Sequence, residues 1–309
     1  MPTPGPQQRS RLHAGLVAGV LAVSWAAILV RMASAPPLAV AAWRMVLAAV
    51  PALAFALWRR REELSKVDRR ARLWLGASGL ALALHFAAWI ASLRLTSVAS
   101  SVALVTTQPV WAALLARAFL GERVGGRTWA GIAIAVSGGA VVAGADLDAS
   151  AGALLGDGLA VAGGVMAAAY LVAGRRARAN LSLGAYAGVV YPAAAVTLLL
   201  GAGLAGTRLG GYPAGTWAAL ALLALVPQLV GHSLLNWSLR WLSAPFVAVA
   251  ILGEPVIATL LAIPLLGETP GPLQAAGAAL TLAGVALAAT GEPSPAPPPG
   301  QDGGAMPQM

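Results

Sequence analysis

Long apolar stretches dominate this chain and decide what it can fold into. A transmembrane helix needs about 20 consecutive apolar residues to cross the hydrocarbon core of a bilayer. By that measure the sequence contains ten candidate helices, at residues 13–31, 37–58, 73–93, 97–119, 128–144, 155–173, 184–204, 216–237, 244–266 and 272–290. Because a chain in lipid must satisfy its backbone hydrogen bonds internally, we expect an all-α integral membrane protein with ten transmembrane helices.

The balance of residue types agrees with a membrane protein. Hydrophobic residues make up 59% of the chain and charged residues 10%, whereas a soluble domain carries about 25% charged residues. A net charge of +9 is also typical of nucleic-acid-binding proteins, but the cations lie in short clusters between the apolar stretches, so we predict no nucleic-acid partner. The chain has no cysteine, which excludes disulfides and thiol-bound metals. We predict no metal site and no cofactor.

The distribution of positive charge predicts how the helices are oriented. If the N-terminus is cytoplasmic, sixteen of the 20 Lys and Arg side chains lie in cytoplasmic segments and three lie outside. Cytoplasmic loops of membrane proteins carry such an excess of Lys and Arg. Both termini are therefore expected in the cytoplasm. Residues 1–10 and the Pro/Gly-rich residues 291–309 are expected to be disordered tails.

The sequence contains an internal repeat. Shifted by 146 residues, segment 92–123 aligns without a gap on segment 238–269, with Pro109 over Pro255. The Gly-Glu pair that ends the first segment, at Glu122, is also repeated, at Glu268. These two glutamates fall at helix ends. They are expected to cap and pack the helices, or else to form part of a gate.

The repeat predicts two halves of five helices each, residues 11–144 and 145–290. Because five is an odd number, the second half must enter the membrane in the opposite orientation. Two inverted repeats around a central site form the architecture of many secondary transporters.

The repeated motifs also carry a family resemblance. The pattern Pro-x10-Leu-Gly-Glu occurs as "PVWAALLARAFLGE" (109–122) and as "PVIATLLAIPLLGE" (255–268), each followed by a Gly-rich stretch. With these motifs the chain resembles the ten-helix EamA type of the drug/metabolite transporter superfamily, over residues 12–290. The resemblance implies a bacterial inner-membrane carrier, often an exporter of amino acids or other small metabolites, and commonly one coupled to the proton gradient.

A carboxylate lies in the middle of the ninth predicted helix. A charged Glu254 at the bilayer centre costs about 2.5–3.5 kcal/mol, so the group is suited to being neutral in one state and charged in another. It is expected to bind a proton or a substrate ammonium group; the alternative is a protonated glutamate hydrogen-bonded to a neighbouring helix. Its repeat mate is Gln108, which cannot ionise and is expected near the same interface.

The two prolines next to these residues predict interrupted helices. Each removes one backbone hydrogen bond, so the carbonyls of Val105 and Ile251 lose their usual partners at Pro109 and Pro255. In lipid such carbonyls are tolerated only against protein or a water-filled cavity. They are expected to face a substrate path, or else the prolines only kink the helices for packing.

The eighth predicted helix carries a polar stripe. Gln228, His232 and Asn236 recur every four residues and would share one face of a helix. They are expected to line a cavity, with hydrogen bonding between helices as the alternative.

Further candidates lie in other predicted helices. His85 is expected to relay protons, and Trp89 to stack on a substrate or fill the core. Arg44 is expected either to bind an anionic group such as a substrate carboxylate or to extend outward to the surface. Tyr191 and Trp25 are weaker candidates for the same pocket.

These features together predict a proton-coupled secondary transporter and not an enzyme. Its expected partners are a small-molecule substrate, protons and the lipid bilayer, in a monomer or weak homodimer. A passive channel or facilitator on the same scaffold is the main alternative. A membrane-embedded enzyme is the other, but two isolated histidines and one glutamate give it little support.

Overall fold

Helices are the regular elements throughout the part of the chain that the structure describes. The computed structural model describes residues 6–96, 101, 104–144, 150–266 and 271–291. Its elements are α1 (Pro6–Val23), α2 (Ala26–Met32), α3 (Pro37–Arg59), α4 (Arg61–Ser65), α5 (Arg69–Ser92), α7 (Gln108–Leu120), α8 (Gly126–Gly144), α9 (Ala151–Arg178), α10 (Leu183–Leu204), α11 (Ala214–Leu223), the π-helix η1 (Ala224–His232), α12 (Ser233–Ser238), α13 (Ala244–Ile251), α14 (Gly253–Leu266) and α15 (Pro272–Thr290). The predicted all-α class is confirmed.

Seven helical segments of the described chain are long and apolar enough to cross a membrane. They cover Ser10–Met32, Pro37–Arg59, Arg69–Ser92, Ala151–Arg178, Leu183–Leu204, Ala214–Ser238 and Ala244–Leu265. The spans expected at 97–119, 128–144 and 272–290 are not among them, so the number ten stays a prediction. Helix α7 has 13 residues, and part of the predicted span before it, residues 97–100, 102 and 103, lies outside the described chain.

The N-terminal end differs from the expectation. Helix α1 begins at Pro6, so the predicted disorder of residues 1–10 is wrong for residues 6–10. The first predicted span is also interrupted, because α1 ends at Val23 and α2 begins at Ala26. The hydroxyl of Ser24 donates a hydrogen bond to the Val20 carbonyl at 2.7 Å, a local bond that competes with helix continuation. The predicted C-terminal tail beyond residue 291 lies outside the described residues.

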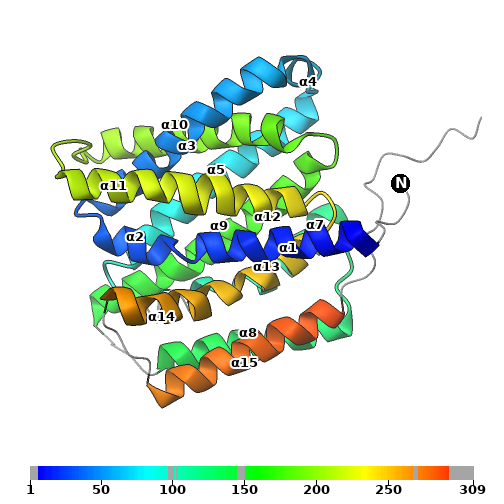
Figure 1. Ribbon diagram of the computed structural model, residues 1–309, viewed down its shortest axis with the longest axis vertical. Helices are drawn as coiled ribbons and strands as arrows, with labels where there is room; N and C mark the ends of the chain where they lie inside the picture. Colours follow the sequence, from blue (N-terminus) through cyan, green and yellow to red (C-terminus); the bar gives the residue numbers. More distant parts are fainter. Residues whose placement is uncertain (1–5, 97–100, 102–103, 145–149, 267–270, 292–309) are drawn as a thin grey trace, which may run out of the picture.

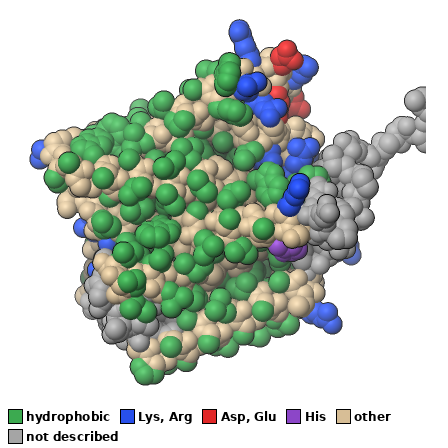
Figure 2. Space-filling model, viewed as in Figure 1, with side chains coloured by type: hydrophobic (Ala, Val, Ile, Leu, Met, Phe, Trp, Pro, Cys, Tyr) green, Lys and Arg blue, Asp and Glu red, His purple; other side chains and the backbone are tan. Residues whose placement is uncertain are grey.

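The long helices lie side by side with similar directions (Figure 1). Helix α10 packs on α3 and α5 at one end of the bundle, α8 and α15 form a pair at the other, and α1, α9, α12 and α13 lie between them. Hydrophobic side chains are spread over the whole face in Figure 2, and charged side chains gather at its edges. Such a surface suits contact with lipid.

Helices α8 and α15 meet through glycines. An ideal Cβ added to Gly131 would lie 2.6 Å from the Gly284 carbonyl oxygen, and one added to Gly138 would lie 2.6 Å from the Gly277 carbonyl oxygen. The 146-residue shift relates Gly131 to Gly277 and Gly138 to Gly284, so the two contacts are reciprocal. Thr281 donates a hydrogen bond to the carbonyl of its own repeat mate, Ala135, at 3.4 Å. Reciprocal contacts of this kind are the mark of a two-fold axis.

Because the backbones touch here, Gly131→Ala is expected to push α8 and α15 apart. The new methyl would meet the Ala288 backbone nitrogen at 2.5 Å, and overpacking of this kind costs about 1–3 kcal/mol. Thermal unfolding of the detergent-solubilised protein should show a lower Tm. The control is Gly144→Ala in the same helix, where nothing lies within 4 Å of the added methyl. An equal Tm for both variants would contradict the close packing.

Candidate substrate cavity

Two interrupted helices meet at the centre of the candidate site. Helix α13 ends at Ile251 and α14 begins at Gly253, so Pro255 lies in the first turn of a new helix. In the same way α7 begins at Gln108, with Pro109 in its first turn. The first turn tolerates proline because its N–H groups have no helical partner. The helix break therefore falls just before each proline, and neither proline kinks a continuous helix.

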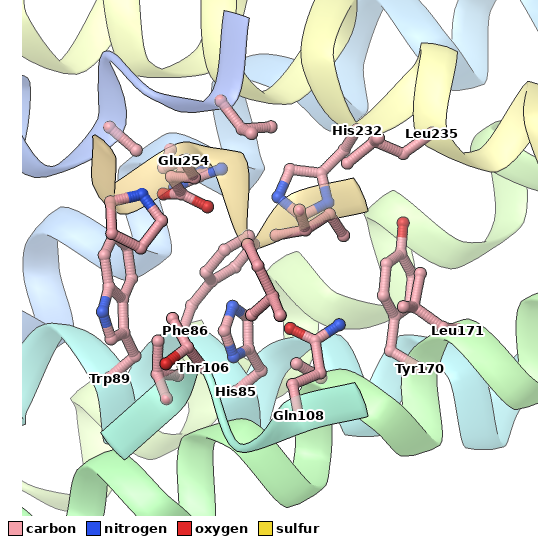
Figure 3. A pocket seen from close by; sticks show the side chains of 18 residues that line it. His85, Phe86, Trp89, Thr106, Gln108, Tyr170, Leu171, His232, Leu235 and Glu254 are labelled. Carbon is pink, nitrogen blue, oxygen red and sulfur yellow. The ribbon is translucent and has the colours of Figure 1, made fainter. Parts of the chain in front are cut away.

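A cavity lies against both interruptions (Figure 3). Its lining residues are Val23, Ala26, Arg44, His85, Phe86, Trp89, Val105, Thr106, Gln108, Ala167, Tyr170, Leu171, His232, Leu235, Ile251, Leu252, Glu254 and Pro255. Three lining pairs are repeat mates: Val105 with Ile251, Thr106 with Leu252, and Gln108 with Glu254. Both halves of the sequence thus supply equivalent positions to one cavity.

The predicted site residues divide between this cavity and its surroundings. Those that line it are Arg44, His85, Trp89, Gln108, His232, Glu254 and Pro255. Those outside the lining are Trp25, Pro109, Tyr191, Gln228 and Asn236. Val105 and Ile251, whose carbonyls were expected to lose their helical partners, both line the cavity. The Val105 carbonyl oxygen also faces α9, because a Cβ added to Gly164 of that helix would lie 3.0 Å from it.

Arg44 of α3 is held inside the bundle, with 1% of its surface exposed. Its Nε donates a hydrogen bond to Gln228 Oε1 at 3.1 Å, and its guanidinium carbon lies 3.9 Å from the centre of the Phe86 ring. The Nη1 atom has no hydrogen-bond partner within the described part of the chain. Gln228 thus fixes one edge of the guanidinium and the Phe86 ring fixes one face. The edge that carries Nη1 remains available to a ligand in the cavity.

Glu254 projects into the same cavity from the first turn of α14. Its charge and that of Arg44 attract each other. The ion pair that the structure records among the described residues is a different one, between Arg175 and Glu122. Arg44 and Glu254 therefore carry opposite charges on one cavity without forming a salt bridge with each other.

Aromatic rings and histidines form much of the cavity wall. His85 stacks on Trp89, with the two rings 6.0 Å apart and inclined by 5°. His85 Nδ1 lies 2.9 Å from the Gly163 carbonyl oxygen, which fits a ring that donates from Nδ1. His232 contacts Phe86 edge-on at 5.4 Å and Tyr170 at 5.9 Å. The wall is thus largely apolar with a few polar atoms, as in small-molecule sites.

The predicted polar stripe lies partly behind the wall. Gln228 bonds to Arg44, and the Asn236 amide donates to the Tyr170 hydroxyl. Tyr191 bonds in turn to the Gln228 carbonyl and to the Ser233 hydroxyl. Helix η1 explains why the stripe divides, since a π-helix closes i→i+5 bonds and residues four apart no longer share a face. Trp25 is 38% exposed and lies outside the cavity.

Sequence reasoning missed several wall residues, among them Phe86 and Thr106. Phe86 directly follows His85, but an aromatic residue in an apolar helix has the same signature whether it faces lipid, core or cavity. For Thr106 a signal was present, because it is two residues before Gln108 in a repeated segment. Within the described ranges, no group of three His, Asp or Glu side chains is placed to hold a metal ion.

A charged network joins three helices away from the cavity. Arg175 of α9 donates from Nε to Glu122 at 3.0 Å, and from Nη1 to the carbonyls of Leu239 and Arg240 at 2.8 and 2.9 Å. It thereby links the end of α7 to the chain that follows α12. Glu268, the repeat mate of Glu122, lies outside the described residues.

Removing the acid of this network by Glu122→Gln is expected to lower the free energy of unfolding by about 1.5–3 kcal/mol, the range for a hydrogen bond to a charged group. Arg175→Gln should cost more, because three bonds are lost. Denaturation in mixed detergent would measure both, with exposed Glu62→Gln as the control. If Glu122→Gln matches Glu62→Gln, the network does not stabilise the bundle.

A helical membrane protein with a cavity at interrupted helices is built in the way secondary transporters are built. Comparison with known proteins identifies the group. The profile of the EamA-like transporter family matches residues 12–144 and, a second time, residues 154–290. The chain belongs to this family, within the drug/metabolite transporter superfamily, and is a multi-pass membrane protein.

Individual relatives agree with this assignment. The "Probable terminal-alkyne amino-acid exporter" of Streptantibioticus cattleyicolor is 32% identical over 188 residues, which are 60% of this chain and 61% of that protein. The match thus spans less than two thirds of the relative's length. A protein of known crystal structure superposes with a TM-score of 0.73 and 22% identity, over 90% of this chain and 98% of that chain. The second likeness shows a shared fold.

Proposed function

We propose that this protein is a proton-coupled secondary transporter that exports amino acids or similar small metabolites by alternating access. The observation that carries the proposal is the cavity at the two interrupted helices, which holds one buried cation, Arg44, and one carboxylate, Glu254. Secondary transporters bind substrate and coupling ions at such broken helices near the bilayer midplane. The name of the S. cattleyicolor relative supports an amino acid as the substrate.

In this proposal the chain consists of two inverted repeats of five helices, residues 11–144 and 145–290. Three observations support it: the two separate family matches, the reciprocal glycine contacts of α8 and α15, and the three mate pairs that line the cavity. The distribution of Arg and Lys supports both termini in the cytoplasm, and membership of the EamA-like family supports a location in a bacterial inner membrane.

Glu254 is the proposed coupling group, which takes either a proton or the ammonium group of the substrate. Glu254 lies in the cavity and its repeat mate is Gln108, so at this pair of equivalent positions one half of the molecule supplies an ionisable side chain and the other an amide. His85 and His232, on the wall, are the proposed route by which protons reach it.

Transport by purified protein in lipid vesicles tests this function. An imposed pH gradient is expected to drive a labelled amino acid above its outside concentration, and a protonophore should abolish the accumulation. The panel should include L-propargylglycine, an amino acid with a terminal alkyne. Flux that only equalises the two concentrations would favour the alternative, a passive facilitator. No flux of any panel member would contradict the proposed substrate class.

A further inference from the structure

One feature of the cavity is more specific than a polar lining. The guanidinium of Arg44 is held by Gln228 along one edge and by Phe86 across one face, at 3.1 and 3.9 Å. Its Nη1 atom is buried without a partner in the described part of the chain, and so is Nε1 of Trp89, a side chain that is 4% exposed. Buried donors are normally satisfied. Two such donors on one cavity indicate an acceptor that enters from outside.

The acceptor that fits an arginine edge best is a carboxylate. The planar guanidinium forms short, charge-assisted bonds to carboxylate oxygens. A fixed cation within the bilayer also needs a counter-charge, because an unpaired buried charge is costly. Glu254 supplies the opposite charge on the same cavity, but does so without a direct ion pair. The space between the two groups is therefore suited to a ligand that carries both charges.

The remaining wall indicates what else such a ligand contains. Beside the charged groups, a large part of the cavity wall is formed by Phe86, Trp89, Tyr170, Leu171 and Leu235, and its other polar members are His85, His232, Thr106 and Gln108. The first five side chains are aromatic or aliphatic, and beyond Arg44 and Glu254 the described lining contains no Arg, Lys, Asp or Glu that would pair with a charged ligand side chain. An apolar ligand side chain would instead gain by leaving water.

We infer that the cavity recognises both charged ends of a zwitterionic α-amino acid with an apolar side chain. Arg44 takes the carboxylate, and Glu254 takes the ammonium group. This inference rests on the proposed function and assigns the substrate groups within it. The ligand and the two residues then form two neutralised pairs, so that binding adds no net charge to the cavity. A proton and the substrate ammonium compete for Glu254.

A set of three related ligands separates the two ends. L-propargylglycine carries both charged groups, pent-4-ynoic acid lacks the ammonium group, and but-3-yn-1-amine lacks the carboxylate. Binding to the purified full-length protein in detergent would be measured by calorimetry at neutral pH. The amino acid is expected to bind about 10- to 100-fold more tightly than either analogue, the factor that one hydrogen-bonded charge supplies.

Two variants should each remove one of these preferences: Arg44→Gln the preference for the carboxylate, and Glu254→Gln the preference for the ammonium group. Arg44→Gln is expected to bind the amine as well as the amino acid, because the carboxylate no longer gains a partner. Glu254→Gln is expected to bind the acid as well as the amino acid, because Arg44 then needs only an anion. Arg70→Gln, an exposed cation in α5, should keep both preferences. A purely structural role for Arg44 would weaken all three ligands equally.

The outcomes are separable. If Arg44→Gln does not fold, as judged by size-exclusion chromatography, Arg44→Lys tests the same preference, with a smaller loss expected because a lysine ammonium lacks the planar fork. A folded Arg44 variant that keeps the preference for the amino acid over the amine would overturn the inference. Retained preferences in Glu254→Gln would do the same. Binding of the amino acid without proton-driven transport would instead contradict the proposed function and leave the charge assignment standing.

Discussion

Replacing Glu254 by Gln is expected to abolish proton-driven accumulation of amino acids in vesicles. The amide keeps the size of the side chain but cannot gain or lose a proton, so the pH gradient has no group on which to act. The position also matters, because Glu254 lies in the cavity, at the start of α14. At saturating amino acid, exchange of labelled for unlabelled substrate should persist. Substrate movement thus continues while its coupling is lost.

The control for this experiment is Glu62→Gln, which removes an exposed carboxylate from the short helix α4. It should accumulate amino acid like the unmodified protein. Accumulation by Glu254→Gln that still collapses with a protonophore would show that another group carries the proton. The two histidines on the wall, His85 and His232, would then be examined first.

Filling the cavity is expected to stop transport altogether. Ala167 of α9 is 5% exposed and lines the cavity. In Ala167→Phe, the added phenyl ring would occupy space that the substrate needs, and uptake should fall to the level of protein-free vesicles. The ring has apolar neighbours there, Tyr170 and Leu171 among them, so the cost in stability should stay within the roughly 1–3 kcal/mol typical of overpacking.

Ala162→Phe is the matched control, because Ala162 lies in the same helix on an exposed face. The same ring should there meet lipid and leave both uptake and folding unchanged. Size-exclusion chromatography would show whether each variant is folded. A folded Ala167→Phe protein that transports at the normal rate would place the substrate path elsewhere.

The sequence alone predicted the all-α class and seven of the apolar spans, because length and apolar composition are local properties. The repeat also related Gln108 to Glu254, and both line the cavity. Hydrogen bonds between side chains that are far apart in the sequence have no local pattern that would predict them. Arg44 bonds to Gln228 across 184 residues, and nothing in either helix indicates the other.

Two further differences have local physical causes. The stripe of Gln228, His232 and Asn236 was placed on one face by α-helical spacing, and the π-helix η1 changes that spacing. The prolines were read with kinks as one alternative, whereas each lies in the first turn of a helix. In both cases residue spacing was read against a regular helix that the chain does not form.

The glycine contact between α8 and α15 bears on how two halves of such a molecule could move. It is made largely of main-chain atoms, and Thr281 there bonds to its own repeat mate, Ala135. Main-chain atoms have no alternative rotamers, so the contact between α8 and α15 cannot repack in the way that a contact between side chains can. In the proposed alternating-access cycle this junction would serve as the pivot, with α8 and α15 staying in register while the helices at the cavity tilt.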